Sequence, residues 1–175
     1  MMRIEPIARF DLAFSLFCLQ HKFNSEVARI SKAVSHTGDG HLYLVIGLLA
    51  WWLEPVIGGI FLMTGLMAFA IELPIYWVAK NSFRRRRPEE LSNQLTSYIT
   101  PSDRYSLPSG HTAAAFVMAT LIGHFFPDAY VTAIVWAALI GSARILLGVH
   151  FLTDVVIGAA LGIGSAIAAI SLIGA

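Results

Sequence analysis

The chain has 175 residues, enough for one domain, and hydrophobic residues make up 57% of it while charged residues make up 13%. Soluble domains average roughly 45–50% and about 25%, so this composition excludes an ordinary water-exposed globular protein and indicates a surface that faces lipid. The formal net charge of +1 conceals an asymmetry, because Arg144 is the last Lys or Arg and all the others precede residue 105.

The first forty residues predict helices at or near the membrane surface. Apolar residues recur at helical spacing over residues 4–21 after a polar start, which fits either an interfacial helix or a short membrane span. Residues 24–36 combine apolar and charged positions at the spacing of an amphipathic helix. Asp39, between two glycines, is expected to cap the next helix, because the first amides of a helix need an acceptor; a catalytic role is the alternative.

The rest of the chain contains five apolar segments, at residues 41–53, 56–79, 111–126, 129–149 and 151–174. A helix needs roughly 20 residues to cross the hydrocarbon at about 1.5 Å per residue, so the first segment is short for a full crossing. The pattern predicts an all-α, polytopic membrane bundle of five to six transmembrane helices with an N-terminal amphipathic segment. We expect residues 1–175 to form one membrane-embedded domain, with an interfacial part at 1–40 and the active site within 80–154.

The order of the segments also predicts how the bundle is arranged. Residues 80–110 are polar and contain three prolines, so they lie outside the hydrocarbon. If each of the four apolar helices from residue 56 onward crosses once, this polar segment emerges on the same side as residues 144–154. In the last helix, Gly158, Gly162 and Ala166 recur every four residues, which predicts a small-residue face for close helix packing.

Three groups of cationic and titratable residues stand at the ends of the apolar segments. They are Lys80 with Arg87, the tetrapeptide Pro108-Ser109-Gly110-His111, and Arg144 with His150 and Asp154. The tetrapeptide fits an anion site, because the first amides of a helix lack partners and the helix dipole is positive there. Guanidinium groups fork onto phosphate oxygens and an ammonium adds a point charge, so the three groups together predict a phosphate site.

The two histidines of these groups predict proton and phosphoryl chemistry. His150 and Asp154 are four residues apart, so on a helix they share one face, and the carboxylate can hold one imidazole nitrogen while the other acts as nucleophile. His111 can carry a proton near neutral pH. Such a set works without a metal, since preorganised cations stabilise the charge of the transferring phosphoryl group.

Each element taken alone has a simpler explanation. Arg144 could pair with a neighbour or extend to the membrane interface, and the tetrapeptide could be a capped turn. Residues 84–86, all arginine, are interpreted as a headgroup-binding patch at the membrane surface. Glu72 lies two turns before Lys80 on nearly the same helix face, so we interpret it as the ion-pair partner of Lys80.

In order and spacing, the residues resemble the type 2 phosphatidic acid phosphatase superfamily of membrane lipid phosphatases, whose fold is shared with vanadium haloperoxidases. The first motif of that family is Lys, six residues, then Arg-Pro, and Lys80, Arg87 and Pro88 match it. The second is Pro-Ser-Gly-His, matched by residues 108–111.

The third motif of the family is Ser-Arg, five residues, His, three residues, Asp. Arg144, His150 and Asp154 match it, but Ala143 stands at the serine position. Ser142 is one position early and is expected to face elsewhere on a helix. Because the family uses this serine to support the site, its loss is expected to weaken a hydrogen bond without removing a core group.

The resemblance implies a six-helix bundle and a role for each matched residue. His150, held by Asp154, would attack phosphorus and form a phosphohistidine, His111 would protonate the leaving lipid oxygen, and water would then attack the intermediate. The substrate phosphate would be bound by Lys80, Arg87, Ser109, the amide of Gly110, and Arg144. We expect no metal and no cofactor.

The leading hypothesis is an integral membrane phosphatase that hydrolyses a phosphomonoester or diphosphate of a membrane lipid. Undecaprenyl diphosphate, phosphatidylglycerol phosphate and phosphatidic acid are the candidate substrates; the expected partners are this lipid and the bilayer, with no nucleic acid and with the oligomeric state left open. The alternatives are a lipid phosphotransferase with the same intermediate, a vanadate-dependent haloperoxidase and a non-catalytic membrane protein. The apolar segments argue against the haloperoxidases of the family, which are soluble, and charges at membrane depth argue against a protein without a site.

The resemblance also implies a location. We expect a multi-pass protein of the bacterial inner (cytoplasmic) membrane, with the active site on the periplasmic face. The positive-inside rule alone would place the Lys- and Arg-rich loops in the cytoplasm. Because phosphate binding accounts for several of these charges, the expectation follows the family.

Overall fold

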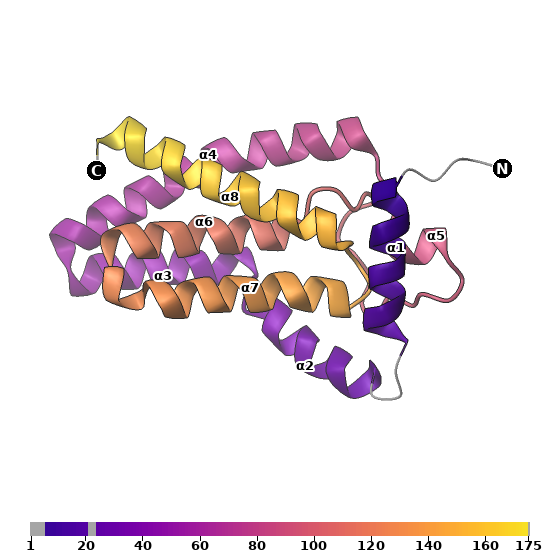
Figure 1. The fold of residues 1–175 in the computed structure, drawn as a ribbon. Coiled ribbons are helices and arrows are strands. Elements are labelled where there is room, and N and C mark those ends of the chain that lie inside the picture. The colour runs from indigo at the N-terminus through magenta and orange to yellow at the C-terminus, as the bar shows by residue number, and fades with distance from the viewer. Residues whose placement is uncertain (1–5, 21–23, 175) are drawn as a thin grey trace.

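Helices make up the fold. The computed structural model describes residues 6–20 and 24–174, and these residues contain eight α-helices, one 3-10 helix and no strand (Figure 1). In chain order the elements are α1 (Pro6–Leu19), α2 (Asn24–His36), α3 (Gly40–Leu53), α4 (Pro55–Phe83), α5 (Pro88–Leu91), α6 (Gly110–Phe125), η1 (Pro127–Ala129), α7 (Tyr130–Leu146) and α8 (Leu152–Ile173). The predicted all-α fold class is confirmed.

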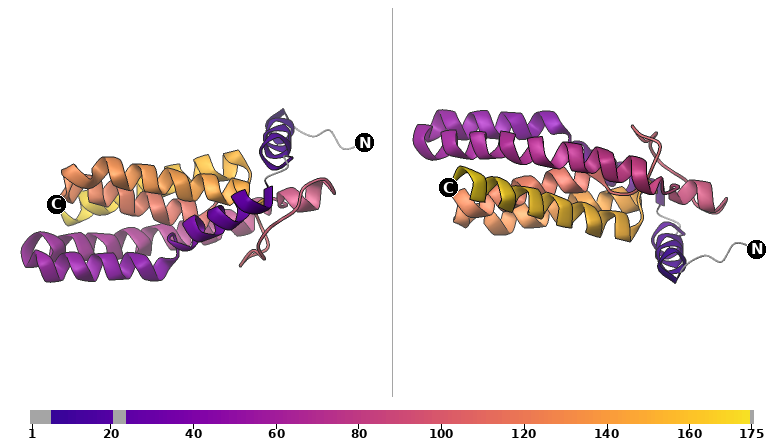
Figure 2. Two further views of the ribbon diagram at one scale, coloured as in Figure 1. Left: turned by 90° about the horizontal axis from the view of Figure 1, so that it is seen from below. Right: turned by 90° about the horizontal axis from the view of Figure 1, so that it is seen from above.

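The long helices α3, α4, α6, α7 and α8 run side by side and form a bundle (Figure 1, Figure 2). α3 and α4 form one antiparallel pair, and α6 and α7 form another, joined through η1. α1 lies across one end of the bundle, where residues 84–109 and the α7–α8 connection are also found (Figure 1). The end of α8 and the turns between α3 and α4 and between α6 and α7 lie at the opposite end. The polar segment and residues 144–154 therefore meet at one end, as the order of segments predicted.

Local backbone conformation sets the ends of the helices that carry the predicted site. α7 ends at Leu146, before the predicted boundary at 149, because Gly148 adopts a left-handed conformation with φ of 72°. α8 begins after Phe151, whose backbone is extended. α4 runs past its predicted end to Phe83, and Arg84 closes it in a left-handed conformation with φ of 48°.

Glycines bring α8 unusually close to α6. A Cβ atom on Gly158 would lie 2.6 Å from the carbonyl oxygen of Ser109, and one on Gly162 would lie 2.2 Å from that of Ala113. Both distances are far below van der Waals contact, so any other residue would push the helices apart. The predicted small-residue face, completed by the fully buried Ala166, is confirmed. Its consequence is that the start of α6 lies against the start of α8.

The exterior of the bundle is largely apolar. Within the described residues, three stretches are long and apolar enough to cross a membrane, at Pro55–Leu91, Pro127–Leu146 and Leu152–Ile173. α3 has 14 residues and α6 has 16, which corresponds to about 21 Å and about 24 Å against roughly 30 Å of hydrocarbon. The number of five to six transmembrane helices stays a prediction.

α1 has an unusual distribution of polar and apolar residues. Its buried residues are Asp11, Ser15 and Leu19, and its exposed large apolar residues are Ile7, Phe10 and Phe17. The interfacial or membrane-spanning role predicted for this segment stays a prediction. Residues 4, 5 and 21 of the segment predicted here lie outside the described residues.

Candidate active site

The predicted site residues converge at the end of the bundle that α1 crosses. A cavity of about 510 Å³ is lined by residues that include Arg87, Gly110, His111, Arg144 and His150. Next to it, the buried residues Lys80, Ser109 and Asp154 complete the predicted set. The three groups of residues that are separate in the sequence therefore form one constellation.

Lys80, in the last turn of α4, is paired with a residue that sequence reasoning missed. Its ammonium nitrogen lies 2.7 Å from Oδ2 of Asp103 and donates a hydrogen bond of 2.6 Å to the hydroxyl of Tyr76. That hydroxyl in turn donates to Asp103 at 2.6 Å. The predicted ion pair between Lys80 and Glu72 is wrong, because the loop carrying Asp103 folds back and supplies a closer carboxylate. No spacing in the sequence signals this contact.

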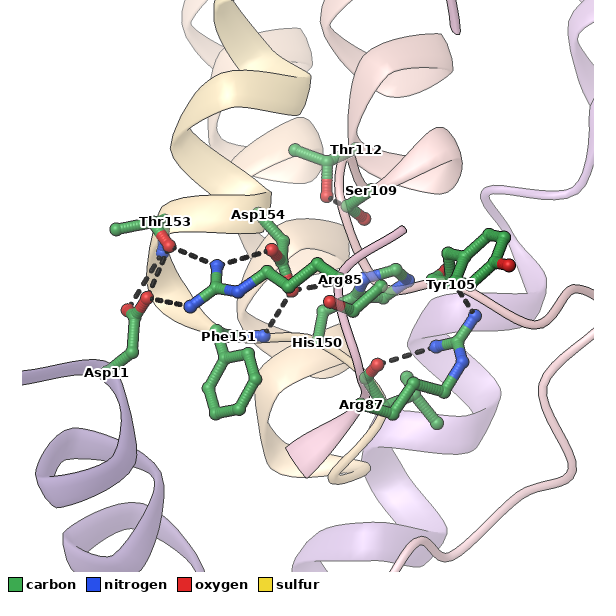
Figure 3. Close-up of polar contacts among 12 residues, drawn as sticks. Asp11, Arg85, Arg87, Tyr105, Ser109, Thr112, His150, Phe151, Thr153 and Asp154 are labelled. Carbon is green, nitrogen blue, oxygen red and sulfur yellow. Dashed lines mark hydrogen bonds and ion pairs between the residues drawn. The ribbon is translucent and has the colours of Figure 1, made fainter. Parts of the chain in front are cut away.

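Arg87 fixes the loop before α6 to the connection between α7 and α8. Its guanidinium donates to the carbonyl oxygen of Val149 at 2.6 Å and to that of Asp103 at 3.0 Å. It also donates to the carbonyl oxygen of Tyr105 at 3.1 Å (Figure 3). It also forms an ion pair with the Asp103 carboxylate. Burial alone would raise the pKa of Asp103, but hydrogen bonds from Lys80 and Tyr76, with the charges of Lys80 and Arg87, hold this pKa below its usual value.

The tetrapeptide forms the start of α6. Ser109 is the N-cap residue, but its hydroxyl lies 2.8 Å from that of Thr112 rather than capping a helix amide. Its backbone amide donates to the carbonyl oxygen of Asp154 at 3.1 Å, which ties the start of α6 to α8. Packing favours glycine at position 110, since a Cβ atom there would lie 2.9 Å from the Tyr76 ring.

His111 contacts Asp39, a residue whose role the sequence did not predict correctly. Nε2 of His111 lies 3.1 Å from Oδ1 of Asp39, and Oδ2 of Asp39 lies 2.6 Å from Nδ1 of His36. Asp39 does occupy the N-cap position of α3, but its side chain makes no capping hydrogen bond within the described structure. The prediction of a capping side chain is therefore wrong, because Asp39 instead orients His111.

Arg144 is buried in the last turn of α7 and lines the cavity. One guanidinium nitrogen donates to the hydroxyl of Ser35 in α2 at 2.8 Å. Its Nε is buried and has no hydrogen-bond partner among the residues that the structure describes. A buried N–H group without an acceptor is costly, so this geometry suits a group that receives an anion from the cavity.

His150 lies in the α7–α8 connection, with Asp154 one turn further along. Its Nδ1 is 3.7 Å from Oδ2 of Asp154, which is an electrostatic contact longer than a hydrogen bond. The same oxygen accepts the amide of Phe151 at 2.8 Å. Burial lowers the pKa of His150 to about 4, although the Asp154 carboxylate acts to raise it, so the imidazole is neutral near pH 7. Because Nδ1 faces the carboxylate, Nε2 is the nitrogen left for chemistry.

Comparison with protein families shows which family carries this set of residues. The model of the PAP2 superfamily matches residues 56–175, a stretch that includes all the cations and histidines of the cavity named above. The chain belongs to the PAP2 superfamily. The resemblance inferred from the motifs is thus confirmed.

Two relatives and one solved structure show how far the similarity extends. Decaprenylphosphoryl-5-phosphoribose phosphatase of Mycobacterium tuberculosis is 33% identical over 137 residues, or 75% of this chain and 72% of that protein. Lipid A 4'-phosphatase of Porphyromonas gingivalis is 32% identical over 78 residues, which cover 43% of this chain and 33% of that protein. The crystal structure of LpxE from Aquifex aeolicus superposes with a TM-score of 0.82 and 25% identity, over 97% of this chain and 99% of that one. The chain spans only 33% to 64% of the length of three matched relatives, the lipid A 4'-phosphatase among them.

The departure from the third PAP2 motif is visible in the structure. Ala143 is buried beside Arg144, whereas the exposed Ser142 donates its hydroxyl to the carbonyl oxygen of Ala138 at 2.8 Å. Ser142 therefore does not replace the missing serine, as its position in the sequence predicted.

The position of Arg85 differs from the predicted surface patch of residues 84–86. Arg84 and Arg86 are exposed, as a headgroup patch requires, but Arg85 turns inward and forms ion pairs with Asp11 and Asp154 (Figure 3). The interpretation of Arg85 as part of a surface patch is wrong, because two buried carboxylates attract it. Asp11 was also missed, although an acid within an apolar helix is a signal that could have found it.

Proposed function

We propose that this protein is an integral membrane phosphatase that removes phosphate from a lipid phosphomonoester or diphosphate. The observation that carries the proposal is the buried cluster of Lys80, Arg87 and Arg144 around His150 and His111, at the end of an apolar cavity. The names of the PAP2 relatives, each a phosphatase of a lipid or a lipid-linked sugar, support it.

The geometry supports a two-step transfer. Nε2 of His150 attacks phosphorus, and a nitrogen–phosphorus bond forms as the bond between phosphorus and the lipid oxygen breaks. His111, held by Asp39, donates a proton to that oxygen, while Asp154 balances the positive charge on His150. Water then gives its proton to His111 and attacks phosphorus, which releases phosphate and restores His150.

Three cations are positioned to stabilise the charge that develops on the phosphoryl oxygens. Lys80, Arg87 and Arg144 are each at most 5% exposed, and in such a site fixed charges act more strongly than in water. The first amides of α6 and the hydroxyl of Ser109 add neutral donors. We propose that these groups bind the substrate phosphate without a metal or cofactor.

The two halves of the site suit a lipid. Away from the cations, the 510 Å³ cavity is lined mainly by apolar side chains, among them Leu44, Leu62, Leu66, Phe69 and Met118. A second cavity of about 670 Å³ shares Ser102, His111 and Arg144 with the first and adds Arg29, Lys32 and His36. We propose that the apolar side receives the hydrocarbon chain and that the polar side admits water and releases phosphate.

We further propose that residues 1–175 act as one membrane-embedded domain, with α3, α4, α6, α7 and α8 crossing the bilayer and the site within residues 80–154. α1 and α2 would lie at the interface, since α1 crosses the end of the bundle (Figure 1). By analogy with the family, the protein would reside in a bacterial inner membrane with its site on the periplasmic face.

The test is phosphate release by the detergent-purified protein from a panel of lipids, with chelator present. The panel contains undecaprenyl diphosphate, phosphatidylglycerol phosphate, phosphatidic acid, lipid A phosphate and a polyprenyl phosphate sugar. His150→Ala and Arg144→Ala are expected to abolish release, whereas His124→Ala, at the far end of α6, is the matched histidine control. Release that survives in His150→Ala, or that needs added metal, would refute the mechanism. Consumption of a lipid without free phosphate would indicate transfer to a lipid acceptor instead.

A further inference from the structure

The two oxygens of the Asp154 carboxylate are held by different partners. Oδ2 accepts the amide of Phe151 at 2.8 Å and faces His150, whereas Oδ1 accepts Nη1 of Arg85 at 2.7 Å (Figure 3). Asp154 itself is fully buried, so bulk solvent does not reach its oxygens. The direction in which Oδ2 points therefore depends on Arg85.

Arg85 is itself fixed on several sides. Nη1 also donates to the hydroxyl of Thr153 at 2.6 Å, and Nη2 donates to Asp11 at 2.5 Å. The guanidinium lies over the ring of Phe151, 4.4 Å from its centroid. A planar fork that binds two carboxylates and stacks on a ring is specific to arginine, because a lysine ammonium presents a single point of charge.

Asp11 anchors this arrangement from α1. It is fully buried and accepts both the backbone amide of Thr153, at 3.2 Å, and the hydroxyl of the same residue. The contact joins residues 142 positions apart in the sequence and places a carboxylate at the start of α8, where the helix dipole favours negative charge. Two buried carboxylates thus share one guanidinium, and removal of that guanidinium would leave both without a counter-charge.

From this geometry we infer that Arg85 and Asp11 are positioning residues of the active site, which hold the Asp154 carboxylate and through it the ring of His150. The inference rests on the phosphoryl transfer proposed above. It makes α1 a part of the catalytic machinery, because Asp11 is the residue through which this helix reaches the site. Neither residue is a defined position of the three motifs, since Arg85 is one of the six variable residues of the first, and neither lines the main cavity.

The experiment compares Arg85→Gln and Asp11→Asn with Arg9→Gln, an exposed arginine on α1, in the full-length protein. Steady-state kinetics on the best lipid are combined with inhibition by inorganic phosphate and with thermal unfolding. We expect kcat to fall about 10- to 100-fold in the first two variants. This is the range seen in metalloenzymes when the hydrogen-bond partners that orient metal-binding histidines are removed. KM and the phosphate inhibition constant are expected to change little, since Lys80, Arg87 and Arg144 remain, and Arg9→Gln should behave as wild type.

Two further variants separate positioning from general support. Arg85→Lys keeps the charge but cannot fork onto both carboxylates, so it should stay nearly as slow as Arg85→Gln. The double variant Asp11→Asn with Arg85→Gln should be no slower than Arg85→Gln alone, because both changes break one network.

Wild-type kcat in Arg85→Gln and Asp11→Asn would overturn the inference. So would a parallel loss of kcat, phosphate inhibition and thermal stability, which would indicate a structural role only. If the wild-type protein released no phosphate from any lipid, or if His150→Ala stayed active, the proposed function itself would fall and this inference with it.

Discussion

Lys80 and Asp103 form an ion pair of 2.7 Å, and the same carboxylate contacts the guanidinium of Arg87. The two cations of the first motif are therefore both balanced by one acid on the loop before α6. A phosphate would therefore compete with the Asp103 carboxylate for Lys80 and Arg87. Asp103 organises the cations and at the same time limits their affinity for an anion.

Asp103→Asn is accordingly expected to strengthen inhibition by inorganic phosphate and to lower KM for the lipid. The change should be several-fold and at most about tenfold, because Asp103 is partly exposed and solvent screens its charge. The pKa of Asp103 lies below its usual value, so the effect should be present throughout the neutral range. Asp128→Asn, at the opposite end of the bundle, is the matched control. Weaker phosphate inhibition in Asp103→Asn would show that organisation outweighs competition.

The protonation of His150 makes a prediction about pH. Its pKa of about 4 lies below the ordinary imidazole value, so the neutral form is present above pH 4 and the nucleophile is lost as pH falls through that value. Nuclear magnetic resonance of histidine-labelled protein, with His150→Gln for assignment, should show a ring titrating near pH 4. A His150 signal that titrates near 6.5 would contradict a buried neutral nucleophile.

The contact between α6 and α8 can be tested through its glycines. Gly158→Ala places a Cβ atom 2.6 Å from the carbonyl oxygen of Ser109, next to the amide that binds Asp154. We expect a loss of about 1–3 kcal/mol in stability, as in other overpacked sites, together with reduced kcat. Gly164→Ala, on the same helix but with no atom within 4 Å among the described residues, should change neither. Thermal unfolding in detergent measures the difference, and equal unfolding temperatures for the two variants would argue against this contact.

The periodic parts of the fold were predictable from the sequence, whereas the loop contacts were not. The spacing of Gly158 and Gly162 indicated the helix face that meets α6, and the four-residue interval from His150 to Asp154 indicated the histidine–carboxylate pair. Asp103 could not be placed, because it lies in a segment with no helical period and reaches Lys80 only through the fold of residues 92–109.

The contacts of α1 could not be predicted from the sequence for a related reason. Arg85 is an ordinary surface residue by local pattern, and although Asp11 stands out as an acid within an apolar helix, no local pattern names its partner. The two meet only because α1 packs across the end of the bundle. The interpretation of Glu72 as partner of Lys80 failed in the same way: the helical spacing was correct, but a nearer acid came from a distant loop. Local periodicity specifies faces, and long-range packing selects which polar groups pair.

A periplasmic site predicts the position of the C-terminus. α8 ends at the end of the bundle opposite the site, so the C-terminus should lie in the cytoplasm (Figure 1). A reporter active only in the cytoplasm, fused after residue 175, should be active, and its periplasm-specific counterpart should be silent. The reverse result would place the site on the cytoplasmic side, as the positive-inside rule alone suggests.

The most direct test of the account is to trap the phosphoryl group on the protein. Rapid acid-free quenching of the enzyme with lipid substrate labelled in its terminal phosphate should give a protein-bound label with the stability of phosphohistidine, stable in base and lost in acid. Mass spectrometry should place the label on His150, and it should be absent in His150→Ala but present in His124→Ala. A label on His111, or lipid hydrolysis in wild type with no labelled protein at any time, would contradict the assignment of His150 as the nucleophile.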